Sequence, residues 1–507
     1  MQDLTHKISR LESVSKEYKP LENQGPHHLD KAIWYNNGFV HLKNNLKPRF
    51  ASIFILFLFV STIFFAQDID QRSILEIENV VKNDMQISGA PGAVIAVVKD
   101  GKIIYQKAFG ISNSKTKIPV NTSTLFLTAS VTKIITTTAL LIACEKSNID
   151  VNTPVGLIIS NLSPKLSQIT IHQILSQSSG ILDHWPTRKK YKNDALEYFA
   201  HYGDKLVCQE LESVFSYTNF GHVLAGLILA TLNESSFQDA IDELIFNPLQ
   251  MNSSTFDVNI AKLNNYSTGH KNGRSVAHKL TYPLIQPSAS MFSNINDLSR
   301  FAICFMNDGK IADQQIISKK VIQQMSENYT PIGVLRVYFG YPNSSYNYGM
   351  MSFKYKGIDF IGHPGESATQ NILFAMAPKH NSAFILLSNS GYYPFINSFE
   401  KMVETFLPFQ ENSQSIPLIN NFDKFIGKYY TPNINGTKDD IIEIELHRKD
   451  LYIRLSEEDA YPLKPIENNR FNYKNPNYKF PMEIAFYLDD KGDIKYLNHF
   501  WRTLIKK

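Results

Sequence analysis

Ser130 and Lys133 lie three residues apart, where an extended segment (TLFLTA) is followed by an apolar stretch with helical spacing. A spacing of three puts both side chains on one helix face, within reach of each other. Free N–H groups at the start of a helix also favour negative charge. A serine hydroxyl needs a base, which a neutral lysine or a lysine-stabilised phenolate supplies. The pair predicts a serine nucleophile, but an isolated Ser-x-x-Lys, such as Ser398–Lys401, is usually a capping serine with a solvated lysine.

A second group, Tyr217 and Asn219, stands in the segment FSYTNFG before an apolar helical stretch, and we expect both side chains to project from a loop. Tyrosine and lysine have ordinary pKa values of about 10 and 10.4, so either needs a shift of about three units, ~4 kcal/mol, to act as a base at neutral pH. A desolvated cleft that places Lys133 beside Tyr217 would divide this shift between them. Alone, Tyr-x-Asn is more often a packing or capping pair.

The third group is the segment IGHPGE, residues 361–366, which follows the strand-like YKGIDF. His363 is a candidate for binding a substrate carbonyl or carboxylate, although a single histidine in a strand is usually structural. The order Ser-x-x-Lys, Tyr-x-Asn, His-x-Gly gives the three groups more weight together than separately.

The elements that must position these residues are strands at both ends of a helical middle. Residues 92–110 alternate on both sides of Asp100-Gly101, which predicts a hairpin. Long helices are predicted at Val131–Cys144 and His222–Leu232, and strands at Ile358–Ile361 and Ala383–Asn389. We therefore expect an α+β fold.

The C-terminal part reads as a separate β module. The Gln-, Ser- and Pro-rich residues 408–417 predict a linker. Beyond it, IIEIELHRKDLYIRL and IAFYLDDKGDIKYL each alternate on both sides of a turn, so residues 418–507 are expected to form a small all-β meander or barrel. No catalytic cluster stands out there.

Composition excludes several classes of protein. The 507 residues are 43% hydrophobic and 19% charged, as in folded globular chains. The net charge is only +4, and residues 1–49 carry 8 Lys and Arg against 5 Asp and Glu, so three of its four units lie in the leader. This argues against a nucleic-acid partner. Cys144, Cys208 and Cys304 are too far apart for a zinc pattern or a disulfide framework, so no metal is expected.

Residues 50–66, FASIFILFLFVSTIFFA, carry no charge and predict export. Their length fits either a signal peptide or a signal anchor. Lys43, Lys47 and Arg49 precede the run and Asp68 follows it, which keeps residues 1–49 inside and sends the rest outward. We expect a periplasmic or extracellular protein, either released or anchored through residues 50–66. The polar leader 1–49 is either part of the protein or the result of a misassigned start.

Taken together, the motifs resemble the serine β-lactamase-like hydrolases of the class C type, which include class C β-lactamases, D-alanyl-D-alanine carboxypeptidases, D-aminopeptidases and β-lactamase-fold esterases. The resemblance covers about residues 89–389, and it rests on PGAVIAVVKDGKIIYQKAFG, TLFLTASVTKIITTTAL, ITIHQILSQSSGI, FSYTNFGHVLAGLIL, PSASMFSNINDLSRFA and YGMMSFKYKGIDFIGHPGE. It implies an antiparallel sheet flanked by helices plus a mostly helical subdomain, spanning residues 67–407. The module 418–507 resembles the lipocalin-like modules of some members.

The resemblance also implies roles. Ser130 would be the acylated nucleophile, Lys133 and Tyr217 would handle its proton, and Asn219 would orient the substrate. The oxyanion hole would be the backbone N–H groups of Ser130 and Glu366. No cofactor is implied.

His363 and Gly365 would form the third substrate-binding motif, with His363 where the lactamases have a lysine. Pro364 removes a small hydroxylated residue that often contacts a substrate carboxylate. It also lacks an N–H, which is tolerated only at a sheet edge or facing the cleft. Glu366 either repels carboxylated substrates or points to solvent. Further departures are QSSG at residues 177–180 and SASM at residues 288–291.

The sequence therefore predicts an exported serine hydrolase that forms a Ser130 acyl-enzyme with an ester or a D-amino-acid-type amide. Its substrate would be a small molecule or a peptide, including pieces of peptidoglycan. Two alternatives remain open: a penicillin-binding-like sensor with little or no turnover, and a scaffold whose function lies in the β module. Oligomeric state is not predicted.

Overall fold

The computed structural model describes residues 70–507, except for residues 187, 209–213, 272, 279–280, 333–343, 392–394, 410–421, 432–439, 468, 477–480, 489–490 and 500–501. The predicted leader 1–49, the apolar run 50–66 and most of the predicted linker 408–417 lie outside the described residues. Within the part of the chain that is described, no helix combines the length and apolarity needed to span a membrane.

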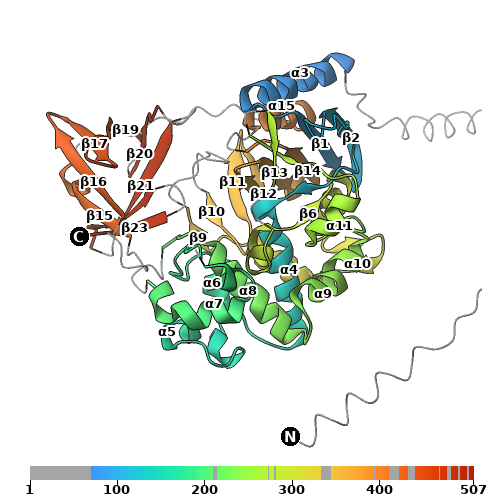
Figure 1. Ribbon diagram of the computed structural model, residues 1–507. Coiled ribbons are helices and arrows are strands. Elements are labelled where there is room, and N and C mark those ends of the chain that lie inside the picture. Colours follow the sequence, from blue (N-terminus) through green and yellow to red (C-terminus); the bar gives the residue numbers. More distant parts are fainter. Residues whose placement is uncertain are drawn as a thin grey trace, which may run out of the picture. The chain divides into compact units, whose positions relative to one another are not determined.

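The larger, N-terminal part of the described chain is built on an antiparallel eight-stranded sheet (Figure 1). The strand order is β2 (Lys102–Gly110), β1 (Gly92–Lys99), β14 (Ser382–Ser388), β13 (Gln370–Ala377), β12 (Ile358–Ser367), β11 (Met351–Tyr355), β10 (Ser345–Tyr346) and β9 (Thr330–Pro331). The predicted hairpin at Asp100-Gly101 is confirmed, since Lys99 pairs with Lys102. Strand β1 also pairs with β14, nearly 300 residues away.

Both faces of this sheet are covered, and alternate residues of each central strand enter different cores. On one face, Val94 and Phe374 join a large cluster with the helices of the middle of the chain. On the other, Ile95 and Leu373 pack with α3 (Gln71–Ser88) and α15 (Ile396–Phe406). Strands buried on both faces have near-continuous apolar sequences, as β13 and β14 do here.

The helical subdomain is organised around two long helices, α4 (Thr132–Lys146) and α8 (Asn219–Leu232), which pack against each other. Both lie where helices were predicted. Every residue of α4 from Thr132 to Cys144 is buried, as expected for a helix without a polar face. The remaining helices are α5 (Pro164–Gln168), α6 (Ile171–Leu175), α7 (Ala195–Tyr202), α9 (Phe237–Ile241), α10 (Asn247–Leu249), α11 (Val258–Leu263), α12 (Gln286–Ala289), α13 (Ile295–Met306) and α14 (Lys319–Ser326).

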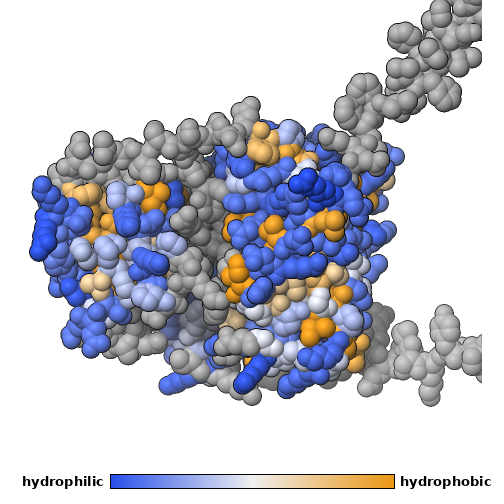
Figure 2. All heavy atoms as spheres, turned by 90° about the horizontal axis from the view of Figure 1, so that it is seen from above, coloured by the Kyte–Doolittle hydropathy of each residue, from blue (hydrophilic) through white to orange (hydrophobic). Residues whose placement is uncertain are grey.

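Short elements connect these parts. Three two-stranded ladders pair β3 (Phe126–Leu127) with β6 (Phe292–Ser293), β4 (Gly269–Lys271) with β5 (Arg274–Val276), and β7 (Lys310–Ile311) with β8 (Gln314–Gln315). Single 3₁₀ turns are η1 (Ala129–Val131), η2 (Val155–Leu157), η3 (Lys189–Lys192), η4 (Gly203–Leu206), η7 (Pro283–Ile285), η8 (Pro378–His380) and η9 (Asp423–Phe425), and η6 (Asp242–Phe246) is a π-helical turn. On the face seen in Figure 2, hydrophobic residues are scattered among hydrophilic ones.

The C-terminal module is a nine-stranded antiparallel sheet with its own core, which contains Phe425, Tyr429, Ile444, Ile453 and Phe471. The strand order is β18 (Ala460–Pro462), β17 (Asp450–Arg454), β16 (Asp440–His447), β15 (Gly427–Thr431), β23 (Arg502–Lys506), β22 (Ile494–His499), β21 (Met482–Leu488), β20 (Arg470–Tyr473) and β19 (Lys464–Glu467).

The two edge strands of this module, β18 and β19, are separated by Leu463 alone. The sheet must therefore curl back on itself into a nearly closed barrel, as expected for a lipocalin-like module. Both predicted hairpins are confirmed: His447 pairs with Asp450 at one, and Leu488 with Ile494 at the other.

Candidate active site

Ser130 lies in a sharp turn between β3 and α4. The sequence placed Ser130 at the start of a helix. In the structure Ser130 lies in the 3₁₀ turn η1, and the α-helix α4 begins at Thr132. Ala129, just before it, has a φ of 46°, in the left-handed region that a residue with a Cβ seldom adopts. Such strain is found where surrounding structure fixes a functional residue. Ser130 remains partly exposed while its neighbours on both sides are buried.

Lys133 is fully buried, and its amine contacts Ser130 Oγ at 3.2 Å. The same nitrogen donates hydrogen bonds to Asn219 Oδ1 at 2.8 Å and to the Ser288 carbonyl at 3.0 Å. Burial lowers the pKa of Lys133 to about 7, against a smaller opposing effect of Asp183. At neutral pH, neutral and protonated forms of this lysine are therefore present in comparable amounts.

Tyr217 completes the contacts of the nucleophile, since its hydroxyl donates to Ser130 Oγ at 2.9 Å. The Lys133 amine lies 4.8 Å from the centre of the Tyr217 ring. Burial, with a further contribution from Tyr346, raises the pKa of Tyr217 well above its ordinary value. The tyrosine is therefore a neutral hydrogen-bond donor, and of the two bases that the sequence left open, the electrostatics favour Lys133.

We expected Asn219 to project from a loop. It is instead the first residue of α8, with Thr218 as its N-cap. The Asn219 backbone N–H donates to Asp183 Oδ1 at 2.8 Å, and its side-chain Nδ2 donates to the same oxygen at 3.2 Å. Because a carboxylate only accepts hydrogen bonds, Asp183 binds the Nδ2 group of the Asn219 amide. The Oδ1 of Asn219 therefore faces Lys133. Asp183 was not predicted as a site residue, and its only signal in the sequence is its position soon after the QSSG segment.

His363 lies in β12 and is fully enclosed. Its Nδ1 is 2.6 Å from the Pro364 carbonyl and its Nε2 is 3.2 Å from the Tyr346 hydroxyl. Since a carbonyl only accepts, Nδ1 carries the proton and Nε2 accepts from Tyr346. Burial, followed by the charge of Lys133, lowers the pKa of His363 to about 3. The imidazole is neutral, so it does not replace the charge of the lysine found here in lactamases.

Gly365 and Glu366 lie where β12 runs past the turn that carries Ser130. Pairing of β12 with β11 ends at Gly362, whereas pairing with β13 continues to Ser367. A Cβ at position 365 would overlap the Thr128 carbonyl, so glycine is what lets the strand approach the turn. The β11 side of the strand end is left open, and Pro364 removes no β11 ladder bond there.

Two segments that depart from the family motifs form hydrogen bonds with residues of the candidate site. Gln177, in the QSSG segment, binds the Thr218 backbone through both side-chain atoms, at 2.9 Å from its N–H and 3.1 Å from its carbonyl. Ser288, in the SASM segment, provides the carbonyl that accepts a hydrogen bond from Lys133.

The C-terminal module contacts the segment that carries Tyr217. The backbone carbonyl of Phe215, two residues before Tyr217, accepts a 2.6 Å hydrogen bond from Thr503 of the module.

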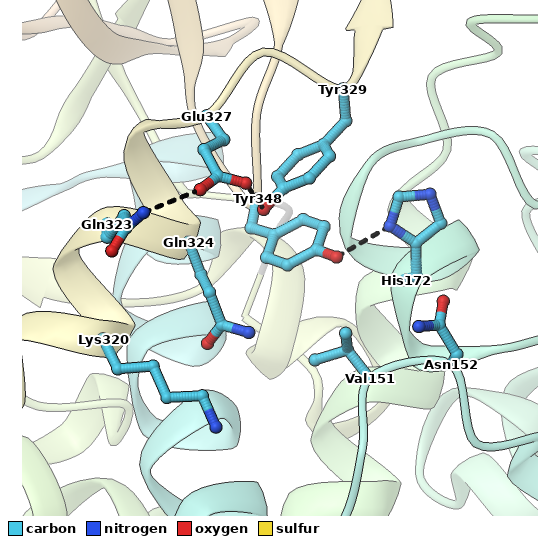
Figure 3. Close-up of a pocket in the computed structure, with 9 residues that line it drawn as sticks. All are labelled: Val151, Asn152, His172, Lys320, Gln323, Gln324, Glu327, Tyr329 and Tyr348. Carbon is cyan, nitrogen blue, oxygen red and sulfur yellow. Dashed lines mark hydrogen bonds between the residues drawn. The ribbon is translucent and has the colours of Figure 1, made fainter.

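The cavity shown in Figure 3 has a volume of about 470 Å³ and is not lined by the residues around Ser130. Tyr329 and Tyr348 stack with ring centres 4.1 Å apart on its wall, and His172 Nδ1 lies 2.7 Å from the Tyr348 hydroxyl. Its other lining residues are Val151, Asn152, Lys320, Gln323, Gln324 and Glu327. None of the nine lining residues is among the predicted site residues, so this cavity is separate from the group around Ser130.

Fold and site together define a β-lactamase-like protein, and comparison with known sequences agrees. Residues 77–402 match the family described as beta-lactamase, so the chain belongs to that family. Protein flp of Staphylococcus aureus (strain MW2) is 27% identical over 339 residues, 63% of this chain and 64% of flp. The chain thus spans less than two thirds of flp. Penicillin-binding protein 4 of Amycolatopsis lactamdurans is 23% identical over 318 residues, 59% of this chain and 81% of that protein.

Solved structures share the fold. The octameric penicillin-binding protein homologue from Pyrococcus abyssi has a TM-score of 0.60 and 23% identity, covering 85% of this chain and all of that one. SurE with D-Leu has a TM-score of 0.66 and 17% identity, over 86% of this chain and all of that one. A class C beta-lactamase has a TM-score of 0.58 and 16% identity, over 68% of this chain and 99% of its own. The predicted family and fold are therefore confirmed.

Proposed function

We propose that this protein is an exported serine hydrolase that forms an acyl-enzyme at Ser130 and cleaves an ester or a D-amino-acid-type amide. The observation that carries the proposal is the environment of the Lys133 amine. In its neutral form this nitrogen has two hydrogens and one lone pair. The hydrogens are taken by Asn219 Oδ1 and the Ser288 carbonyl, which leaves the lone pair for the Ser130 hydroxyl.

In the acylation step that follows, the Ser130 proton passes to Lys133 as Oγ bonds to the substrate carbonyl carbon. Electron density moves to the carbonyl oxygen, where the backbone N–H groups of Ser130 and Glu366 are proposed to bind the resulting negative charge. Tyr217 initially donates a hydrogen bond to Oγ and then delivers a proton to the leaving group, regaining one from Lys133. The bond between carbonyl carbon and leaving group breaks, and the acyl-enzyme and a neutral alcohol or amine result.

Deacylation uses the same groups with water as the nucleophile. Lys133 takes a proton from the water as the water oxygen bonds to the acyl carbon, and Ser130 leaves with that proton. The slow-turnover sensor therefore differs from the hydrolase only in whether water reaches the acyl-enzyme.

The third motif favours acyl donors without a carboxylate. His363 is neutral, Pro364 has no hydroxyl, and Glu366 adds an acid where the family often has a small residue. Among the described residues, the one cation in contact with the nucleophile is Lys133. We therefore place esters ahead of β-lactams and acyl-D-Ala-D-Ala peptides as substrates.

The apolar run 50–66 supports export, and a small-molecule or peptide substrate, including peptidoglycan fragments, fits a site outside the cell membrane. A released protein would be recovered in the soluble fraction, whereas a protein anchored through residues 50–66 would be recovered with the membranes. Processing is tested by N-terminal sequencing of protein recovered from the envelope.

The experiment for acylation is labelling with a fluorophosphonate probe and a fluorescent penicillin, beside turnover of p-nitrophenyl esters, D-Ala peptides and nitrocefin. We expect fluorophosphonate labelling and ester turnover, both abolished in Ser130→Ala. Stable acylation without turnover would favour the sensor. No labelling with any acyl donor would contradict both.

A further inference from the structure

The C-terminal module buries polar side chains on its outer face. Strands β22 and β23 are paired, and Leu497 and Leu504, directly opposite each other, enter the core of the module. Because successive residues of a strand point to opposite faces, the neighbouring pair Asn498 and Thr503 points outward. Both outward side chains are nonetheless buried, at 0% and 2% exposure. The outer face of an isolated barrel would lie in water, so another part of the chain covers these residues.

The segment that carries Tyr217 covers this outer face. Two further outward residues of the module, Tyr496 and Ile505, are paired across the same strands and pack with Val214 in one apolar cluster. Residues 214–218, all within the described chain, form neither a helix nor a strand. The buried backbone groups of such a stretch need partners outside it, because an unpaired N–H or carbonyl is costly. The contacts with the module therefore help to determine where this stretch lies.

The Phe215 carbonyl receives its hydrogen bond from the module. Thr503 donates through Oγ1 at 2.6 Å, and Asn498 Nδ2 lies 3.5 Å from the same carbonyl oxygen. Asn498 Nδ2 also lies 3.3 Å from Thr503 Oγ1. A threonine hydroxyl has one hydrogen, so Thr503 gives it to the carbonyl and accepts from Asn498. The amide of Asn498 thus orients the hydroxyl that binds Phe215.

The peptide group between Phe215 and Ser216 is held from two sides. Its carbonyl accepts from Thr503, and its N–H donates to the Gln177 carbonyl at 2.9 Å. In a trans peptide these two groups point in opposite directions, so neither hydrogen bond can replace the other. Tyr217 follows this peptide directly in the chain. The position of the peptide therefore determines where the Tyr217 side chain begins.

We propose that Thr503 is a positioning residue for Tyr217, and that the C-terminal module is thereby part of the acylation site. The Tyr217 hydroxyl donates to Ser130 Oγ at 2.9 Å, a contact that lengthens if the segment shifts. A misplacement of ~1 Å in such a group can cost ~10²-fold in rate. Thr503 acts through the Phe215 peptide rather than on the reacting atoms. This proposal rests on the proposed function, because Tyr217 is the proton donor of the Ser130 site.

The test removes the Thr503 hydroxyl in the full chain. Thr503→Val keeps nearly the same shape without the donor, and Thr503→Ser keeps the donor. We expect Thr503→Val to lower the acylation rate about 10-fold, and more for an anilide, which leaves only when protonated, than for a p-nitrophenyl ester. Thr503→Ser should acylate close to the wild-type rate. Thr405→Val, which removes a threonine hydroxyl bound to the Lys401 carbonyl in α15, is the matched control and should acylate normally.

A double-mutant cycle distinguishes positioning of Tyr217 from a general loss of stability. If Thr503 acts through Tyr217, Thr503→Val lowers acylation in the wild-type background but not in Tyr217→Phe. Equal losses in both backgrounds, or a wild-type rate in Thr503→Val, would overturn the proposal. Thr503→Ala, which cannot crowd the Phe215 carbonyl, takes the place of Thr503→Val if the valine variant does not fold.

Amide hydrogen exchange separates this proposal from the proposed function, because it needs no substrate. Thr503→Val should speed exchange at the Ser216 N–H, and Thr503→Ser should not. If the wild-type protein is acylated by no substrate but exchange changes in this way, the hydrolase assignment fails and the hold of the module on the segment stands. If Ser130-dependent acylation is measured and Thr503→Val changes neither acylation nor exchange, the positioning role fails and the hydrolase stands.

Discussion

The charged residues around Ser130 and Glu445 of the C-terminal module differ in ion pairing and in the direction of their pKa shifts. In the module, Arg454 binds Glu445 through two nitrogens, at 2.6 and 2.9 Å, and this ion pair lowers the pKa of Glu445 to about 2. In the active site, Lys133 and Glu366 form no ion pair with an oppositely charged side chain among the described residues. Burial moves their pKa values to about 7 and about 8.

This difference separates charges that hold a structure from charges that exchange protons. An ion pair stabilises the charged forms and moves both pKa values away from neutrality. Desolvation without a partner moves them toward neutrality, where a proton is transferred at low cost. The contrast supports the proposal that proton transfer takes place around Ser130, and the following variants test it from the largest expected effect to the smallest.

Removing the amine in Lys133→Met should lower the acylation rate about 10³-fold, within the range typical of a lost general base. The melting temperature should change little, because methionine avoids the desolvation cost of the buried amine but leaves Asn219 Oδ1 and the Ser288 carbonyl without their donor. Stopped-flow acylation with a p-nitrophenyl ester and a thermal melt provide the two measurements. Lys356→Met, which removes a lysine paired with Glu404, is the control and should acylate normally. A Lys133→Met rate within 10-fold of the wild type would rule out the amine as the base.

Removing the phenol hydroxyl in Tyr217→Phe should lower acylation about 10²-fold, because Ser130 loses a hydrogen-bond donor and the leaving group loses its proton source. The loss should be larger for an anilide than for a p-nitrophenyl ester, since p-nitrophenolate leaves without a proton. Rates for the two substrates are measured side by side. Equal losses would limit Tyr217 to orienting Ser130.

Much of this site could be predicted from the sequence, because its short-range spacing fixes local geometry. Ser130 and Lys133 are one helical turn apart, and the structure brings them together with Tyr217 and Asn219. The choice between Lys133 and Tyr217 as base could not be predicted, since it depends on burial by segments as distant as Ser288.

Asp183 was missed for the same reason. Its contact with Asn219 bridges 36 residues and exists only once α8 is in place. In the C-terminal module the hairpins were predicted from alternation and turns, whereas the pairing of β15 with β23, which brings the two ends of the module together, has no local signal.

Asp183→Asn should reduce acylation about 10-fold, by weakening the hold on Asn219 within the usual range for a charge-assisted hydrogen bond. It should also move the pH profile to lower pH, because the negative charge of Asp183 raises the pKa of Lys133. The acylation rate is followed between pH 5 and 9. A lower rate without any shift of the midpoint would restrict Asp183 to a structural role.

Glu445→Gln should have the smallest effect, with no change in acylation. The pKa of Glu445 is lowered on folding, so its stabilising contribution is present above about pH 4.5 and is lost as the pH falls toward 2. Melting temperatures of the variant and the wild-type protein should therefore converge as the pH is lowered through this range. Divergence on acidification would mean that Glu445 does not contribute through its ion pair.

The central claim, that the neutral form of Lys133 is the base and is already populated near pH 7, is tested most directly by the pH dependence of Ser130 acylation under single-turnover conditions. The account predicts a rate that rises with pH through a midpoint near 7, as Lys133 loses its proton, and a rise that is absent in Lys133→Met. A midpoint near 10, the ordinary value for a lysine, or the same profile in Lys133→Met would contradict it.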